Sequence, residues 1–459
     1  KNGKPEPALA ETIHISQDLK TYTFFLKKSF WSNGDIITAH DFEYSWKKII
    51  SPLFSTAFMY FFYPIKNAKL ATEGKCSIDD VGIWAIDKSK LVIELENPTP
   101  EFLELTAHTL YSPVNNEMDR KHPNWGSGEE GKFVCNGPFM IGKLIPGVRA
   151  TFVNNTLYWD KDQVKIENIL VSKDNSFIAN EMFKNNETDW LGKPLRAWEP
   201  FFAKNKEDLV SSNPIGVFWC IFNTSTFPFN NMKLRQAFSL AIDKTALTSS
   251  LSYEAIPAST PLPLSHTMNH EANQVSSNQE KALALFEEAL IELGLNRGTF
   301  PVITLIYSNS NTRENASLFL SQQWQKTFQI HAQVIGYEFH SCLNKLMKGN
   351  YQVGTLVWQS LIDNPLYTLN AFKESTHDIN FAKWSNEEYV QLLDRAQKAD
   401  DPLVRIKALA EAERILIKEK PVCPLFYEKE RNIRKQHLKN VYYSATTGHV
   451  DFKYTYIER

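Results

Sequence analysis

The chain has 459 residues, and its acidic and basic side chains nearly balance at a formal net charge of −2. A chain of this length exceeds what one hydrophobic core usually organises, so two or three domains are expected. The balanced charge argues against a nucleic-acid-binding protein, which would need a basic stripe to displace counterions from phosphates. No run of about 18 apolar residues occurs, so no segment is expected to span a membrane.

The first ten residues, KNGKPEPALA, lack the apolar core of a signal peptide, so we expect any export signal to have been removed or to lie outside this sequence. The cysteines are far apart and include no Cys-x-x-Cys pair: Cys76, Cys135, Cys220, Cys342 and Cys423. The spacing therefore gives little support for a zinc site or a redox motif. We expect mostly buried free thiols and no metal or cofactor.

The N-terminal part mixes short strands with helices. Thr21–Leu26 has the composition of a strand, and Thr38 and Asp41 have the spacing of a capping box. The box predicts a helix that continues to about Ile50, before Pro52. Further elements are expected at residues 91–95 (strand), 101–108 (helix), and 139–144 with 150–153 (hairpin).

The C-terminal part shows a similar mixture. A fully apolar strand is expected at residues 218–222, followed by a helix over 232–243 with one apolar face. Gly294 is placed to end a helix over Gln279–Leu293. We also expect strands at 302–307, 331–334 and 424–427, and helices at 316–328, 386–399 and 402–419. This mixture along the whole chain indicates an α/β or α+β class.

The stretch from Tyr351 to Asn370 is the most informative one. It begins with an apolar run that ends at Trp358 and is then broken by Asp363, Asn364 and Pro365. We expect a buried strand that runs into a loop, and open α/β sheets commonly place ligands beyond such strand ends. On the pattern alone, an ordinary core strand with a buried Trp358 is the simpler interpretation.

Five stretches resemble the extracytoplasmic solute-binding proteins of peptide-type ABC transporters. The most specific patterns are WSNGDIITAHDFEYSW and PFNNMKLRQAFSLAID, and they occur in the family's order. The five stretches are residues 30–52, 136–139 with 158–159, 223–244, 308–339 with the Trp358 stretch, and 422–427. Together they extend over essentially the whole chain.

The resemblance implies an α/β fold, namely a two-lobed periplasmic binding protein of type II with an extra domain. We expect the extra domain at residues 1–122, a discontinuous first lobe at 123–216 with 429–459, and the second lobe at 217–428. Family members also carry several dozen residues upstream of the position of Lys1, and these supply one edge of the ligand site. The sequence is therefore expected to be a truncated or processed form.

The polar anchors that the resemblance implies are changed in this chain. In peptide-binding members, an aspartate three residues after the tryptophan binds the peptide's α-ammonium, and that position is Leu361 here. Two arginines near the peptide's carboxylate correspond to Thr355 and Leu346. A buried ammonium without its carboxylate would cost roughly 3–5 kcal/mol, so a free-ended peptide requires a replacement. Asp363 and Glu428 are the candidates, although a turn cap or a solvated charge explains each more simply.

The resemblance also implies uncharged residues in the ligand site. Seven residues fall on or beside segments that line the family's cleft: Trp219, Cys220, Phe339, Val357, Trp358, Gln359 and Tyr427. Aromatic walls suit ligands of varied sequence, because they bury side chains of many shapes while the backbone of an extended ligand is hydrogen-bonded.

These patterns predict a monomeric binding protein that captures oligopeptides or peptide-like ligands and delivers them to the permease of an ABC importer. We expect it in the periplasm or anchored outside the membrane, with no nucleic-acid partner. One alternative is an envelope receptor of the same fold for a modified or non-peptide ligand. The other is a cysteine hydrolase using Cys220 or Cys342 with His340 or His331, for which no third orienting group or oxyanion element is evident.

Overall fold

The computed structural model describes residues 5–54, 59–99, 101–127, 133–192, 201, 204, 209–211, 216–251, 254–269, 277–360, 362, 364–399, 401–428, 431–443 and 450–458. The chain forms two compact units, which we describe separately. Unit 1 comprises Lys1–Met182, Lys435–Ser444 and His449–Arg459, and unit 2 comprises Phe183–Arg434 and Ala445–Gly448. Unit 1 joins the expected extra domain to part of the expected first lobe, and the three-domain division stays a prediction.

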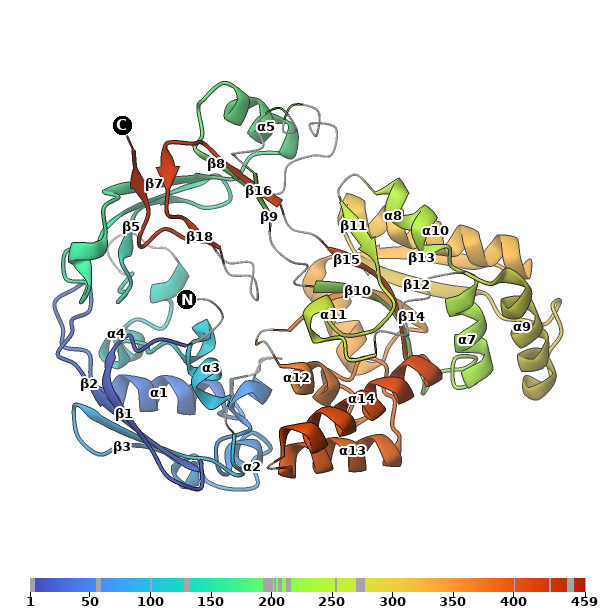
Figure 1. Ribbon diagram of the computed structural model, residues 1–459, viewed down its shortest axis with the longest axis horizontal. Coiled ribbons are helices and arrows are strands. Elements are labelled where there is room, and N and C mark those ends of the chain that lie inside the picture. Colours follow the sequence, from blue (N-terminus) through green and yellow to red (C-terminus); the bar gives the residue numbers. More distant parts are fainter. Residues whose placement is uncertain are drawn as a thin grey trace. The chain divides into compact units, whose positions relative to one another are not determined.

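Unit 1 contains two larger antiparallel sheets and two short strand pairs (Figure 1). One sheet has the strand order β1 (Ala10–Ile15), β2 (Thr21–Leu26), β4 (Lys90–Glu94), β3 (Ile83–Ala85), and the other has the order β5 (Phe139–Ile145), β6 (Arg149–Asn154), β7 (Asn168–Ser172). Near the C-terminus, β17 (Leu438–Lys439) pairs with β20 (Tyr456–Ile457), and β18 (Tyr442–Tyr443) pairs with β19 (Val450–Asp451). The predicted strand at 21–26 and hairpin at 139–153 are confirmed.

The helices of unit 1 are short apart from α1. They are α1 (Ala39–Ile49), α2 (Ala68–Thr72), α3 (Phe102–Thr106), α4 (Asn116–Lys121) and α5 (Ser176–Lys184), which crosses into unit 2. The capping box of α1 forms as predicted, since Thr38 N donates to Asp41 Oδ2 at 2.9 Å. Trp46 of α1 is buried, and its Nε1 donates to Tyr111 O at 2.9 Å, so the helix is fixed on the core of the unit.

Unit 2 is built on a six-stranded mixed sheet. Its strand order is β11 (Ala255–Pro257), β15 (Val422–Glu428), β10 (Gly216–Phe222), β14 (Val353–Gln359), β12 (Ile303–Ser308), β13 (Ala332–Tyr337). β12 runs parallel to β13 and β14, whereas β10 is antiparallel to both of its neighbours. All seven residues of β10 are buried, as its apolar sequence predicts. A small separate sheet has the order β8 (Trp190–Gly192), β16 (Arg431–Arg434), β9 (Leu209–Ser211).

The helices of unit 2 pack on the six-stranded sheet and on one another. They are α7 (Met232–Leu240), α8 (Lys244–Ser250), α9 (Gln279–Leu293), α10 (Asn311–Phe328), α11 (Phe339–Lys348), α12 (Pro365–Asn370), α13 (Glu387–Lys398) and α14 (Pro402–Glu419). Phe238 of α7 lies in their core, with ring centroids 5.0 Å from Trp324 and 5.1 Å from Phe328 of α10. The last three helices form a group of their own (Figure 1).

Several elements differ from the sequence predictions, among them three helices of unit 2. α11 was not predicted, although Glu338 caps it by accepting from His340 N and Ser341 N and Gly349 ends it at a φ of 71°. α10 begins five residues earlier than expected, because Ser310 caps it. The helix expected over 232–243 ends at Leu240, because Asp243 serves as the N-cap of α8.

Candidate ligand-binding site

The carboxyl ends of three strands with one direction lie together at one edge of the unit 2 sheet. β12 ends at Ser308 opposite Tyr337 of β13, and β14 pairs with β12 and ends at Gln359. From there the chain enters α10 after β12 and α11 after β13. Open α/β sheets bind ligands outside such strand ends, so this edge is the candidate site.

Phe339 and Arg313 form an aromatic and cationic pair at this edge. Phe339 is the first residue of α11 and is 42% exposed, and the guanidinium of Arg313 lies 6.0 Å from its ring centroid. Arg313 Nη1 donates to Ser308 Oγ at 2.6 Å, which holds the guanidinium at the end of β12. Phe339 was among the predicted site residues, whereas Arg313 was missed. Its sequence signal is a basic residue in the first turn of a helix that follows a buried strand.

Trp358 and Trp219 stack inside unit 2. Their ring centroids are 4.9 Å apart with an interplanar angle of 8°. Trp358 Nε1 donates to Thr368 Oγ1 at 3.0 Å, and Trp219 Nε1 donates to Pro261 O at 2.9 Å. Trp358 is 8% exposed and Trp219 is 1% exposed, so both indoles lie in the interior of the unit. This position agrees with the core interpretation of Trp358, and a contact with ligand stays a prediction.

The other predicted site residues differ in their accessibility within unit 2. Cys220 and Tyr427 are fully buried, while Val357 is partly buried. Gln359 is exposed at the end of β14, and Glu428 is partly buried at the end of β15, opposite Gly216. Leu361 and Asp363 lie outside the described residues. The structure thus places Gln359 and Phe339 at the surface of this unit.

Both positions that the resemblance aligns with arginines are buried. Thr355 is buried in β14, and its Oγ1 has no hydrogen-bond partner among the described residues. Leu346 of α11 is buried against Gly354, where an added Cβ would lie 2.5 Å from Leu346 Cδ2. Neither position therefore brings a cation to the candidate site.

The cysteines lack the environment of a hydrolase nucleophile. Burial raises the pKa of the Cys220 thiol well above its usual range, and it raises that of Cys342 to about 11, so both remain protonated at neutral pH. Cys342 and His340 are two residues apart on a helix, which places them on different faces. His331 precedes the amino end of β13, whereas Cys342 follows its carboxyl end. The described residues also contain no cluster of three or more metal-ligating side chains.

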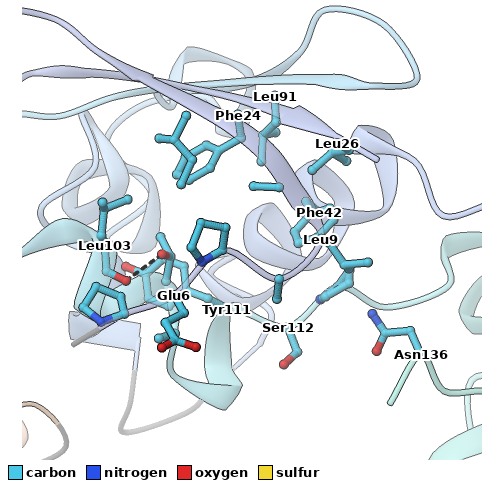
Figure 2. Close-up of a pocket in the computed structure, with 18 of the residues that line it drawn as sticks. Glu6, Leu9, Phe24, Leu26, Phe42, Leu91, Leu103, Tyr111, Ser112 and Asn136 are labelled. Atoms are coloured by element: carbon cyan, nitrogen blue, oxygen red, sulfur yellow. Dashed lines mark hydrogen bonds between the residues drawn. The ribbon is translucent and has the colours of Figure 1, made fainter. Parts of the chain in front are cut away.

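Unit 1 contains a separate cavity of about 480 Å³ (Figure 2). Apolar side chains from β2, α1 and β4 line much of it, among them Phe24, Phe42 and Leu91. Trp46 and Tyr111 also line it, and their polar atoms are hydrogen-bonded to backbone oxygens, Tyr111 Oη to Phe61 O at 2.7 Å. The cavity therefore offers mainly ring faces and aliphatic groups, and no sequence pattern predicted it.

Comparison with known proteins identifies the family of the chain. The family described as bacterial extracellular solute-binding proteins, family 5 Middle, matches residues 4–380. The chain belongs to this family. This family 5 member is 32% identical to the oligopeptide-binding protein OppA of Bacillus subtilis, over 100% of this chain and 86% of that one. It is 28% identical to the dipeptide-binding protein DppE of the same species, over 99% and 84%.

Solved structures of family 5 relatives extend the likeness to three dimensions. The substrate-binding domain of an oligopeptide ABC transporter from Bacillus anthracis gives a TM-score of 0.89 at 26% identity, over 99% of this chain and 91% of that one. Listeria monocytogenes OppA bound to peptide gives a TM-score of 0.87 at 26% identity, over 100% of this chain and 92% of that one. The expected family and the α/β fold of a type II periplasmic binding protein are confirmed. No helix in the described part of the chain is long and apolar enough to cross a membrane.

Proposed function

We propose that this solute-binding protein captures peptides or peptide-like ligands outside the cytoplasm and delivers them unchanged to an ABC importer. The observation that carries the proposal is similarity along the whole chain to proteins named for oligopeptide and dipeptide binding. The peptide-bound relative from Listeria, which matches over 100% of this chain, supports a peptide ligand in the same fold.

In this proposal, the carboxyl edge of the unit 2 sheet supplies part of the ligand surface. Gln359 and Phe339 are exposed there, so they contact ligand directly. Trp358 stacks on buried Trp219 beneath the end of β14 and holds this strand end rigid. An extended peptide bound beside a strand end gains affinity from main-chain hydrogen bonds without selecting its side chains.

The partners and the location follow from the same proposal. A solute-binding protein of an importer works outside the membrane, either free in the periplasm or anchored to the cell surface, and docks on permease subunits. We propose that it acts as a monomer and performs no catalysis. The buried, protonated thiols of Cys220 and Cys342 support the absence of a cysteine nucleophile.

Mass spectrometry of the retained ligand tests whether the protein binds peptides without cleaving them. The protein is incubated with a library of dipeptides to hexapeptides, separated from unbound peptide, and analysed by native and then denaturing mass spectrometry. The proposal predicts retained peptides of unchanged mass. Retention of hydrolysed fragments would instead support an enzyme, and the absence of any retained peptide would contradict peptide capture.

A ligand without a free α-amine is a second candidate, because Leu361 stands where peptide-binding relatives are expected to carry the aspartate that binds this amine. Affinity for one peptide and its N-acetylated form should then differ by less than about 1.4 kcal/mol, a factor of ten. A larger penalty for acetylation would show that another carboxylate receives the amine. Loss of that penalty in Asp363→Asn or Glu428→Gln would identify the residue.

A further inference from the structure

Two basic side chains at the candidate site lack an acidic partner. Arg313, in the first turn of α10, contacts Ser308 Oγ and the Phe339 ring, and Lys345 of α11 lies 4.8 Å from the ring centroid of Tyr337. Neither forms an ion pair with a carboxylate among the described residues. The nearby carboxylates are engaged elsewhere, since Glu338 caps α11 and Glu314 is hydrogen-bonded to Tyr307.

The two cations converge on one region although they come from different helices. Ser308 and Tyr337 pair at the carboxyl ends of β12 and β13. Arg313 contacts Ser308, and Lys345 lies over the Tyr337 ring. Both positive charges also oppose the effect of burial on the pKa of the Cys342 thiol. Cys342 and Lys345 are three residues apart on α11 and so share a face of the helix. Phe339 lies one turn before Cys342 on α11, and the guanidinium of Arg313 lies over its ring. Two cations, two aromatic rings and a neutral thiol therefore surround one place at the carboxyl ends of β12 and β13.

This constellation suits a carboxylate. A guanidinium can bind a carboxylate with two parallel hydrogen bonds, and a nearby ammonium adds a second charge-assisted contact. The exposed ring of Phe339 offers an apolar surface beside these groups. Thr355 of β14 and Leu346 of α11 are neutral and buried, so neither position supplies a competing cation.

We propose that Arg313 and Lys345 together bind a carboxylate of the ligand, with Phe339 packing against the residue that carries it. This inference rests on the proposed capture of peptides. It assigns the acid-binding role to Arg313 and Lys345 rather than to the two aligned positions, Thr355 in β14 and Leu346 in α11. The carboxylate comes either from the peptide's C-terminus or from an acidic side chain.

Three tetrapeptide libraries distinguish these sources: one with free C-termini, one amidated, and one amidated with a fixed glutamate. Retention is read by native mass spectrometry and affinity by competition. The inference predicts that the unmodified protein prefers either the free-acid or the glutamate library over the plain amide by about tenfold or more. A preference for the free acid assigns the terminal carboxylate, and a preference for the glutamate library assigns a side chain.

Arg313→Gln and Lys345→Gln should each reduce this preference to about threefold or less while both proteins still bind the amidated library. Lys348→Gln is the matched control, because Lys348 is an exposed lysine at the end of the same helix. Its preference should stay unchanged. Equal binding of all three libraries by the unmodified protein, or an unchanged preference in both variants, would overturn the inference and leave peptide capture standing. Failure to bind any library would instead contradict peptide capture itself.

Discussion

Lys420 is a basic side chain held in an unfavourable environment at the end of α14. It is partly buried, and burial together with the nearby charge of Lys244 lowers its pKa to about 8. The folded state therefore disfavours the protonated amine that the unfolded chain retains up to a pH near 10.5. Lys420 consequently weakens the fold at neutral pH.

We predict that Lys420→Met raises the free energy of unfolding at pH 7 by about 1–3 kcal/mol, allowing for screening of a partly exposed group. The cost of Lys420 is fully present below pH 8 and disappears as the pH rises through 10.5, so the gain should shrink over this range. Urea denaturation at several pH values measures it, with Lys418→Met, on the exposed side of α14, as control. A gain that does not change with pH would assign the effect to packing.

Trp358 contributes to stability through the contacts described above. We predict that Trp358→Ala lowers the free energy of unfolding by about 3–5 kcal/mol, because a large buried ring is removed. Trp358→Phe keeps part of the stack on Trp219 and loses the hydrogen bond to Thr368, so its cost should be smaller. Denaturant titrations of both variants test this order. Equal stability of Trp358→Ala and the unmodified protein would show that the stack carries little energy.

At the scale of residues, the sequence predicted the region of the candidate site better than it predicted which side chains are exposed there. Phe339 was predicted and is exposed at the strand-end edge, but Cys220 and Tyr427 lie in the interior of unit 2. Arg313 and Lys345 were missed because the expected polar groups were sought at positions aligned with those of relatives. Arg313 had a local signal at the start of a helix, whereas Lys345 lies on α11, a helix that was not predicted.

At the scale of elements, one lysine fastens the C-terminal segment of unit 1. Lys453 Nζ lies 2.6 Å from Asp160 Oδ2 and 4.8 Å from the ring centroid of Trp159, whose ring also lies 3.9 Å from Lys27 Nζ. Burial alone would lower the pKa of Lys453, but hydrogen bonds to Asp160 and nearby tyrosines raise it overall. The ammonium group therefore stays charged, and it ties the segment that contains β19 and β20 to the residues after β6.

Lys453→Met should release this segment, so the backbone amides of β20 should exchange with deuterium several-fold faster while those of β2 do not change. Lys439→Met is a suitable control, because Lys439 pairs with Glu458 at a more exposed position. Hydrogen exchange followed by mass spectrometry gives the comparison. Unchanged exchange in β20 would show that backbone pairing alone holds the segment.

Among the elements, those with local signals were predicted best. The capping box at Thr38 and the C-terminal glycine at Gly294 act within a few residues, and α1 and α9 follow them closely. α12 is short and was missed despite its cap, whereas α11 was missed although Phe339, Cys342 and Leu346 recur at helical spacing. β13 ends three residues later than predicted, because its last residues pair with β12, a partner distant in sequence.

For the molecule as a whole, the sequence sufficed to predict the family and fold class. The patterns that carry the resemblance are spread along the chain, and each reflects packing that the fold requires, such as buried Arg235 donating to Phe229 O and Glu419 O. The ligand could not be predicted in the same way. Its recognition depends on a few side chains from separate elements, and some positions aligned with charged groups of relatives carry neutral residues here.

Thermal denaturation with and without peptide tests the central claim of peptide capture most directly. A ligand that binds only the native state stabilises it by about 2.7 kcal/mol at a hundredfold excess over Kd, so the tetrapeptide library with free C-termini should raise the melting temperature in a concentration-dependent manner. Free amino acids at equal concentration should give a smaller shift. No shift with any library of dipeptides to hexapeptides would contradict the account.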